Sequence, residues 1–100
     1  MTLQITENNE GMLGILDGRL DTAASAEFAR DMQPLMDNAD KHIVLDCEKL
    51  EFVSSSGLRL FLSLRKQTIA KGGDITIRNV SEDIKMVFTI TGFYSLFNFE

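Results

Sequence analysis

The sequence predicts an α/β protein built on one mixed sheet, and two observations support this prediction. Apolar runs of strand length alternate along the chain with helical stretches of about 10 to 17 residues. The first two runs are separated only by the turn-forming segment Asn8–Gly11, which predicts an antiparallel hairpin. The later runs are separated by helices, so we expect right-handed crossovers between neighbouring strands.

Length and composition indicate one soluble globular domain spanning residues 1–100, with 44% hydrophobic and 25% charged residues. No apolar run approaches the roughly 18 to 20 residues of a membrane span, so no membrane insertion is expected. The segment Met1–Glu7 has neither a basic start nor an apolar signal core, which predicts a cytoplasmic protein. The single cysteine, Cys47, fits a reducing compartment, and we expect it to pack as a small apolar side chain.

The charge balance argues against nucleic acid as a partner. The formal net charge is −5, whereas a nucleic-acid site needs clustered Lys and Arg. The densest basic group follows one predicted helix, and we interpret it as a solvated face: Arg59, Arg65, Lys66 and Lys71. An acidic chain is also repelled by an anionic membrane surface.

The first third of the chain predicts two strands and the start of a helix. Leu3–Thr6 alternates apolar and polar residues, and Met12–Leu16 reads as its hairpin partner. Gly18 is expected to mark a bulge or a close backbone approach. Asp21 is expected to cap the helix that follows.

The segment Thr22–Asn38 favours helix but contains a proline. Its apolar stripe is formed by Ala24, Phe28, Leu35 and Met36. Pro34 removes a backbone hydrogen bond and costs about 3 kcal/mol inside a helix. We therefore expect a kink, or two helical pieces meeting near Gln33.

The centre of the chain predicts strand, short loop and helix in succession. Ile43–Leu45 is an apolar run typical of a strand buried on both faces, with His42 at its surface end, and the loop follows at Asp46–Val53. A serine cluster then precedes the helix that begins near Leu58. Ser54 or Ser55 is expected to be the N-cap. A compatible interpretation is that one hydroxyl of the cluster is phosphorylated, because a helix N-terminus favours a phosphate.

The helix after the serines has a broad apolar face: Leu58, Phe61, Leu62 and Ile69, widened by Leu60 and Leu64. Such an arc indicates flanking helices or a part reserved for a partner. Lys71–Gly73 ends the helix.

The last quarter predicts a strand, a helix and a packed tail. Ile75–Ile77 alternates with its neighbours, and Ser81 is expected to cap a helix with acids in its first turn. The apolar stripe of that helix is formed by Ile84, Val87 and Phe88, and Gly92 closes it. The tail is expected to pack through Phe93, Leu96, Phe97 and Phe99.

Three segments resemble the STAS domain, the module of sulfate transporter tails and bacterial anti-sigma factor antagonists. Leu16–Asp21 is similar to the family's G-x-L-D turn, and Val44–Leu58 resembles the segment that carries its D-[ST]-[ST]-G-L signature. Thr91–Phe97 is similar to its closing T-G-L-x-x-L-F segment. Their order and spacing cover nearly the whole chain.

The resemblance implies the α/β STAS fold: a mixed sheet of four to five strands opened by an antiparallel hairpin, with helices mainly on one face. It also implies a switch without enzymatic activity, cofactor or metal. In the family, the antagonist binds an anti-sigma factor that is also a serine kinase, which releases a sigma factor, and phosphorylation of one serine ends the binding. A phosphatase of the PP2C type is the implied partner for the reverse step.

Aligned on Gly57, the resemblance assigns phosphorylation to Ser55, with Ser56 and Ser54 as alternates. Ser54 stands where the family usually has Asp. The implied partner-binding residues are Asp21, Ser54, Ser55, Ser56, Gly57 and Leu58. We expect Asp46, Glu48 and Glu51 to share the loop with the serines and Asp21 to lie at the same edge, so that a phosphate there repels an acidic or tightly packed partner.

Three alternatives stay open at this point. Stand-alone STAS proteins also serve as subunits of phospholipid-transport ABC complexes. A two-component receiver would use Asp46 as phosphoacceptor, but Glu7 and Glu10 do not form the adjacent acidic pair that holds its metal. Catalysis is disfavoured because no paired nucleophile and base, metal-ligand cluster or phosphate loop is visible.

Overall fold

The computed structural model describes residues 1–100 and contains a five-stranded sheet in the order β1-β2-β3-β4-β5. The elements are β1 Thr2–Asn8, β2 Gly11–Leu20, α1 Thr22–Asp31, α2 Gln33–Asp37, β3 His42–Val53, α3 Ser55–Lys71, β4 Asp74–Arg78, α4 Glu82–Ile90, the 3₁₀ turn η1 Tyr94–Leu96 and β5 Asn98–Phe99. β1 pairs with β2 in antiparallel fashion, and all other pairs are parallel. The predicted mixed sheet with its opening hairpin is therefore confirmed.

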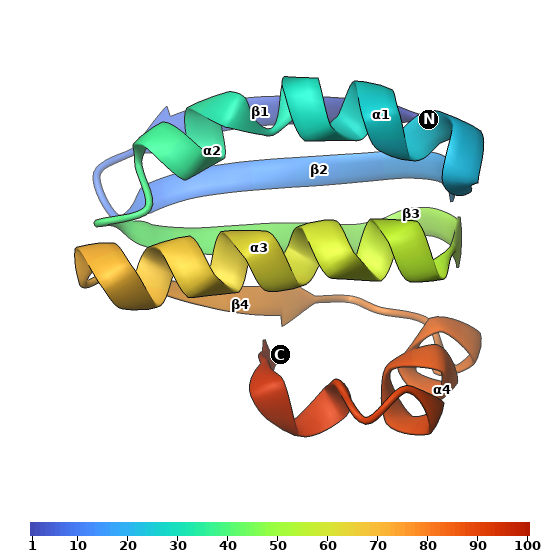
Figure 1. Ribbon diagram of the computed structural model, residues 1–100. Coiled ribbons are helices and arrows are strands. Elements are labelled where there is room, and N and C mark those ends of the chain that lie inside the picture. Colours follow the sequence, from blue (N-terminus) through green and yellow to red (C-terminus); the bar gives the residue numbers. More distant parts are fainter.

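Helices α1, α2 and α3 cover one face of the sheet, and its other face carries no helix (Figure 1). Leu16, Leu45 and Ile77 point into the covered face and are fully buried. Val44, one residue before Leu45, points to the open face and is only half-buried. The prediction that the central strand is buried on both faces is therefore wrong, because its alternate residues have no layer to cover them.

The segment Asp46–Val53, predicted to be a loop, is the second half of β3. The strand contains extra residues, because its register with β2 shifts twice, between Ile15 and Asp17 and between Gly18 and Arg19. These bulges change the burial interval, so that Cys47, Leu50 and Val53 are all buried at three-residue spacing. A strand pattern with period two is lost there, which explains why the sequence suggested a loop.

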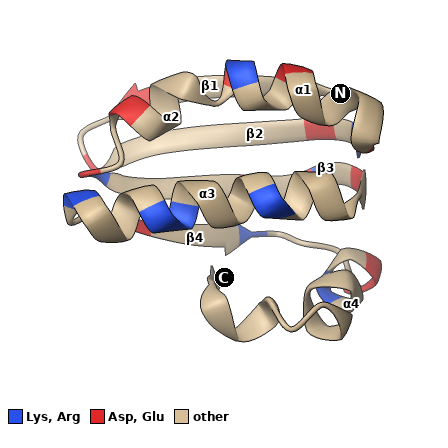
Figure 2. Ribbon diagram, viewed as in Figure 1, with Lys and Arg blue, Asp and Glu red and all other residues tan.

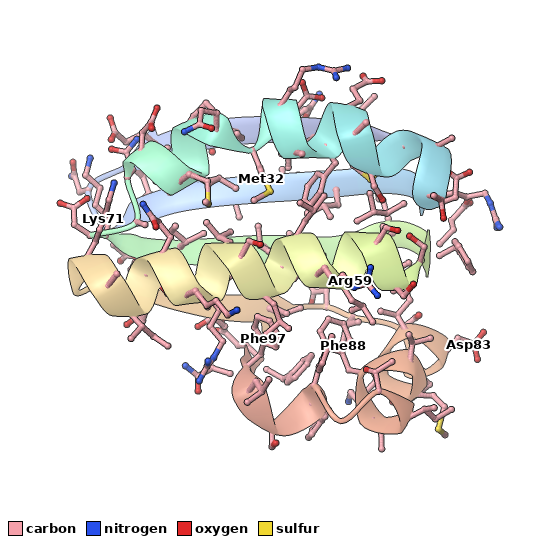
Figure 3. The ribbon with its side chains drawn as sticks, in the orientation of Figure 1. Met32, Arg59, Lys71, Asp83, Phe88 and Phe97 are labelled. Atoms are coloured by element: carbon pink, nitrogen blue, oxygen red, sulfur yellow. The ribbon has the colours of Figure 1, made fainter.

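The region around Pro34 forms two helices, as one of the two expectations stated. α1 ends at Asp31, Met32 lies between the pieces, and Pro34 falls in the first turn of α2, where its missing N–H is tolerated. Phe28 and Leu35 are buried as expected. In Figure 3 the side chain of Met32 points from the junction toward α3, where it joins the core.

Helix α3 packs on the sheet through a slightly different face from the predicted one. Its buried residues are Gly57, Leu58, Phe61, Leu64 and Thr68. Ile69 is 61% exposed, so its predicted place in the core is wrong. It lies at the rim of the buried arc, on the side of the sheet that ends in the two-residue strand β5, and little covers it there.

The C-terminal segment packs, as predicted, and adds a short strand that the sequence did not reveal. The ring of Phe88 on α4 contacts Phe61 at a centroid distance of 6.0 Å, Phe97 at 5.6 Å and Phe99 at 5.3 Å. Figure 3 shows Phe88 and Phe97 facing each other between α4 and the tail. Ser81 caps α4 by accepting a bond from the Ile84 N–H at 3.2 Å. None of the helices is long and hydrophobic enough to cross a membrane.

Candidate functional site

Ser54 joins the end of β3 to the start of α3 and is the N-cap of that helix. Its backbone N–H donates to the carbonyl of Leu20 at 2.8 Å, which ties it to the end of β2. Its Oγ accepts from the N–H of Gly57 at 3.1 Å. Of the two expected cap residues the structure therefore selects Ser54, and a hydroxyl fulfils the capping role that Asp would have at this position.

Ser55 is the first residue of α3 and the most accessible of the three serines. Its side chain is exposed and its hydroxyl makes no hydrogen bond within the protein, whereas Ser54 and Ser56 are half-buried. The first N–H groups of a helix have no acceptor inside the helix. A negatively charged group on Ser55 would therefore meet unpaired N–H groups and the positive end of the helix dipole.

Gly57 and Leu58 follow the serines in the first turn of α3 and pack against the sheet. Both are buried, and a Cβ at Gly57 would lie 2.6 Å from Cγ of Leu20 and 3.2 Å from Cγ2 of Val53. Only a residue without a side chain lets the first turn of α3 approach the ends of β2 and β3 so closely. These two expected site residues thus set the position of Ser55 rather than forming an exposed surface.

Asp21 lies at the same sheet edge as the serines, where sequence analysis placed it. Leu20 and Val53 are paired in the register of β2 and β3, so the residues that follow them, Asp21 and Ser54, start two neighbouring helices. Asp21 accepts a bond from the N–H of Ala24 at 2.8 Å and caps α1. In Figure 1 both α1 and α3 begin at the same end of the sheet. Two positive helix ends and one carboxylate therefore meet at this edge.

The acidic residues expected on the serine loop lie instead on β3. Asp46 is held by neighbours: it accepts from the N–H of Glu48 at 3.0 Å and lies 3.4 Å from both Nη2 of Arg78 and Nδ2 of Asn79. Glu48 and Glu51 are exposed positions of the bulged half of the strand. The expectation of a shared loop is wrong because the bulges keep this segment in the sheet.

A cation–aromatic pair that was not expected from the sequence lies at this edge. The guanidinium carbon of Arg19 lies 4.6 Å from the ring centroid of Phe52, and the two residues are partners in the register of β2 and β3. Phe52 is 38% exposed, just before the buried Val53 and the Ser54 cap. Aromatic and Arg side chains are enriched in protein interfaces. The available signal was an aromatic residue directly before the serine cluster, which was assigned to a loop.

Cys47 is buried in the core, which confirms its expected role as a small apolar side chain. Burial, with a smaller effect of the neighbouring Asp46 charge, raises the pKa of its thiol to about 12. The thiol therefore stays protonated at neutral pH. No group of three or more His, Cys, Asp or Glu side chains is placed to hold a metal ion.

The arrangement suits modification by another enzyme. No imidazole, amine or carboxylate hydrogen-bonds to the hydroxyl of Ser55. The hydroxyl is free, exposed and fixed on the first turn of a rigid helix. A group transferred to it would change the charge of the sheet edge without disturbing the core.

Comparison with known proteins gives consistent results. A family model described as the STAS domain matches residues 3–100. The chain is 30% identical over 89 residues to "Putative anti-sigma factor antagonist BtrV" of Bordetella bronchiseptica, covering 88% of this chain and 77% of that protein. It is 30% identical over 99 residues to "Anti-sigma F factor antagonist" of Paenibacillus polymyxa, covering 96% and 85%. The solved structure "Bacillus Cell Fate Determinant SpoIIAA in the Phosphorylated Form" is 23% identical, with a TM-score of 0.73 over 99% of this chain and 91% of that one.

Proposed function

This chain belongs to the STAS domain family, and from that premise we propose that it is an anti-sigma factor antagonist switched by phosphorylation of Ser55. In this proposal the unmodified protein binds an anti-sigma factor with serine kinase activity, and the sigma factor is released. Two relatives that carry the antagonist name support the proposal. The observation that carries it is the exposed, unbonded hydroxyl of Ser55 on the first turn of α3.

The proposed switch works through charge at the helix end. The kinase transfers the γ-phosphoryl group of ATP to Oγ of Ser55, which adds about −1.5 to −2 charge at neutral pH. The N-terminus of α3 stabilises that charge, typically by 0.3 to 1 kcal/mol, so the fold tolerates it. A partner packed against this edge must instead accommodate a solvated dianion next to Asp21. A loss of about 3 kcal/mol in binding free energy lowers affinity about a hundredfold.

The decisive experiment combines phosphorylation mapping with binding. The protein and its candidate kinase are incubated with ATP, and the phosphate is located by fragmentation mass spectrometry. The same experiment is done with three single variants, Ser54→Ala, Ser55→Ala and Ser56→Ala. We expect Ser55→Ala alone to abolish incorporation. By isothermal titration calorimetry we expect Ser55→Asp to lower affinity for the kinase about a hundredfold, and Ser55→Ala to retain it.

A matched control places the same charge elsewhere. Ser95 is an exposed serine of η1, so Ser95→Asp changes the net charge equally without altering the start of α3. We expect that variant to bind within about twofold of the wild type, since an exposed change outside an interface has little effect. Undiminished binding of Ser55→Asp, or phosphate on a residue other than Ser55, would contradict the proposed switch.

A further inference from the structure

Helix α3 is a strongly cationic element in an acidic protein. Its 17 residues include Arg59, Arg65, Lys66 and Lys71 and no Asp or Glu. The chain has 10 basic and 15 acidic residues in total, so the other elements hold six basic and all fifteen acidic residues, a formal charge of −9. Figure 2 shows this separation directly, because the α3 ribbon carries blue segments and no red one.

Two of these cations have no partner within the protein. Arg65 donates to the carbonyl of Leu96, and Nζ of Lys71 donates to the carbonyl of Met36 at 3.2 Å. Arg59 and Lys66 are exposed and belong to none of the ion pairs within 4.0 Å. An acid three or four residues away can pair with a surface cation on a helix. α3 offers none, so this charge is left uncompensated.

Arg59 and Lys66 lie along one line of the helix, seven residues and therefore roughly 10 Å apart. Ser63 lies between them, also exposed, and its hydroxyl is directed back to the carbonyl of Arg59 at 3.0 Å. We call Arg59, Ser63 and Lys66 the cationic face. Ser55 precedes Arg59 by four residues, one helical turn, so the face continues directly from the proposed phosphorylation site. Figure 3 shows Arg59 on the half of α3 nearest that end.

We propose that the cationic face is a docking surface for an acidic segment of a partner protein. This inference rests on the proposed function, because it assigns a chemistry to the partner that meets Ser55. Complementary charge across an interface speeds encounter and fixes the orientation of binding. It also gives the phosphate of Ser55 a second effect, since a phosphate one turn before Arg59 repels the acidic segment and attracts the Arg59 guanidinium away from it.

The uneven charge of the molecule favours a protein segment over a larger anion. A membrane or a nucleic acid presents negative charge over an area wider than one helix face. It would therefore also meet the exposed acids of α1 and α2, such as Glu27, Asp31 and Asp37, because these helices pack beside α3. Figure 2 shows red segments on both helices. An acidic segment of about two helical turns matches the face without reaching them.

The test uses two charge-reversal variants of the full chain. Arg59→Glu with Lys66→Glu removes the cationic face, and Arg30→Glu with Lys49→Glu makes the same change of net charge at exposed positions outside α3. Circular dichroism confirms that both variants fold. The first probe is a synthetic Glu- and Ala-containing peptide of 14 residues, titrated into isotope-labelled protein and followed by backbone amide NMR shifts. The second probe is the anti-sigma factor kinase used in the Ser55 experiment.

With the peptide we expect shifts centred on residues 59–66 that disappear in the first variant and persist in the second. With the kinase we expect the first variant to lose at least tenfold in affinity and the second to change by less than twofold. Equal effects of the two variants would overturn the proposal, as would stronger binding to phosphatidylglycerol vesicles or to a single-stranded oligonucleotide. If Ser55→Asp abolishes kinase binding while Arg59→Glu with Lys66→Glu does not, the switch stands and the cationic face is refuted. If the kinase does not bind the wild type, the proposed function fails, and the peptide titration alone then tests the cationic face.

Discussion

The two ends of the central strand β3 are built differently. At its start, the polar side chains pair with one another across the sheet: Lys41 with Glu7, and His42 with Asp74. At its end, the strand is bulged, and Ser55 beyond it is exposed without a partner. The start of β3 is therefore held by pairs of polar side chains, whereas the region beyond its end presents an exposed side chain without a partner. The proposed recognition site thus lies at the end of β3 opposite the paired polar side chains.

The glycines at the two ends show the same contrast. A Cβ at Gly73 would lie 2.2 Å from the carbonyl oxygen of Ala39 and 2.4 Å from that of Lys41, so two stretches of backbone touch there. A Cβ at Gly57 would meet mainly the side chain of Leu20, 2.6 Å away at Cγ. A side chain can rotate or be shortened, whereas a backbone carbonyl that follows the sheet cannot move alone. The start of β3 is therefore the less tolerant end.

Replacing these two glycines with alanine should give the largest difference between the two ends of β3. We expect Gly73→Ala to lower the free energy of unfolding by about 3 kcal/mol or more and Gly57→Ala by about 2 kcal/mol, both measured by urea denaturation. Adding Leu20→Ala makes room at Gly57, so the costs of the two substitutions should not add. Additive costs for that pair, or an equal tolerance of Ala at both glycines, would remove the proposed distinction.

At the end of β3, Ser54 is expected to contribute to stability and Ser55, under the proposed function, to recognition of the partner. Ser54→Ala removes the cap of α3, and we expect it to lower the free energy of unfolding by about 1 kcal/mol. Ser55→Ala removes an exposed hydroxyl without hydrogen bonds, and we expect a change below about 0.5 kcal/mol. Thermal denaturation of both variants checks the order. A larger loss for Ser55→Ala would show that its hydroxyl has a structural role.

Cys47, at the first bulge between the two ends, gives an effect that depends on pH. Because burial raises its pKa to about 12, the folded state keeps the thiol proton where the unfolded chain, with a pKa of about 8.5, loses it. This contribution to stability is fully present below the unfolded pKa and is lost as pH rises toward the folded pKa. From pH 7 to pH 9 we expect the unfolding free energy to fall by less than about 1 kcal/mol for this reason.

The control for this prediction is Cys47→Ala, which should have a flatter pH dependence over the same range. A thiol reagent at pH 8 should modify Cys47 only after unfolding, because the side chain is fully buried in the native state. Rapid labelling of the folded protein would mean that the bulge opens readily.

Much of the architecture could be predicted from local signals. The hairpin at Asn8–Gly11, the cap at Asp21, the break near Pro34 and the stop at Gly72 each depend on the conformational preference of one or two residues. The serine cluster was placed at a helix N-terminus for the same reason. Such preferences act over a few neighbours and are visible in any sequence.

Other features depend on partners distant in sequence. The bulges of β3 follow from its pairing with β2, and they turned an expected loop at Asp46–Val53 into a strand. Burial of Val44 and Ile69 depends on whether another layer of structure covers their face of the sheet or helix. The periodicity of the sequence does not contain that information. The Arg19–Phe52 pair likewise exists only because two strands are in register.

The sequence by itself determined the order of the elements up to α4, the caps at Asp21 and Ser81, and the position of the serine cluster at the start of α3, because these follow from backbone preferences within a few residues. The tertiary structure alone decided that Ser54 caps while Ser55 stays free, and that Asp21 begins the neighbouring helix at the same edge. It also left Arg59 and Lys66 unpaired on the outer side of α3. Exposure and pairing are relations between distant segments, so they are fixed only when the chain has folded.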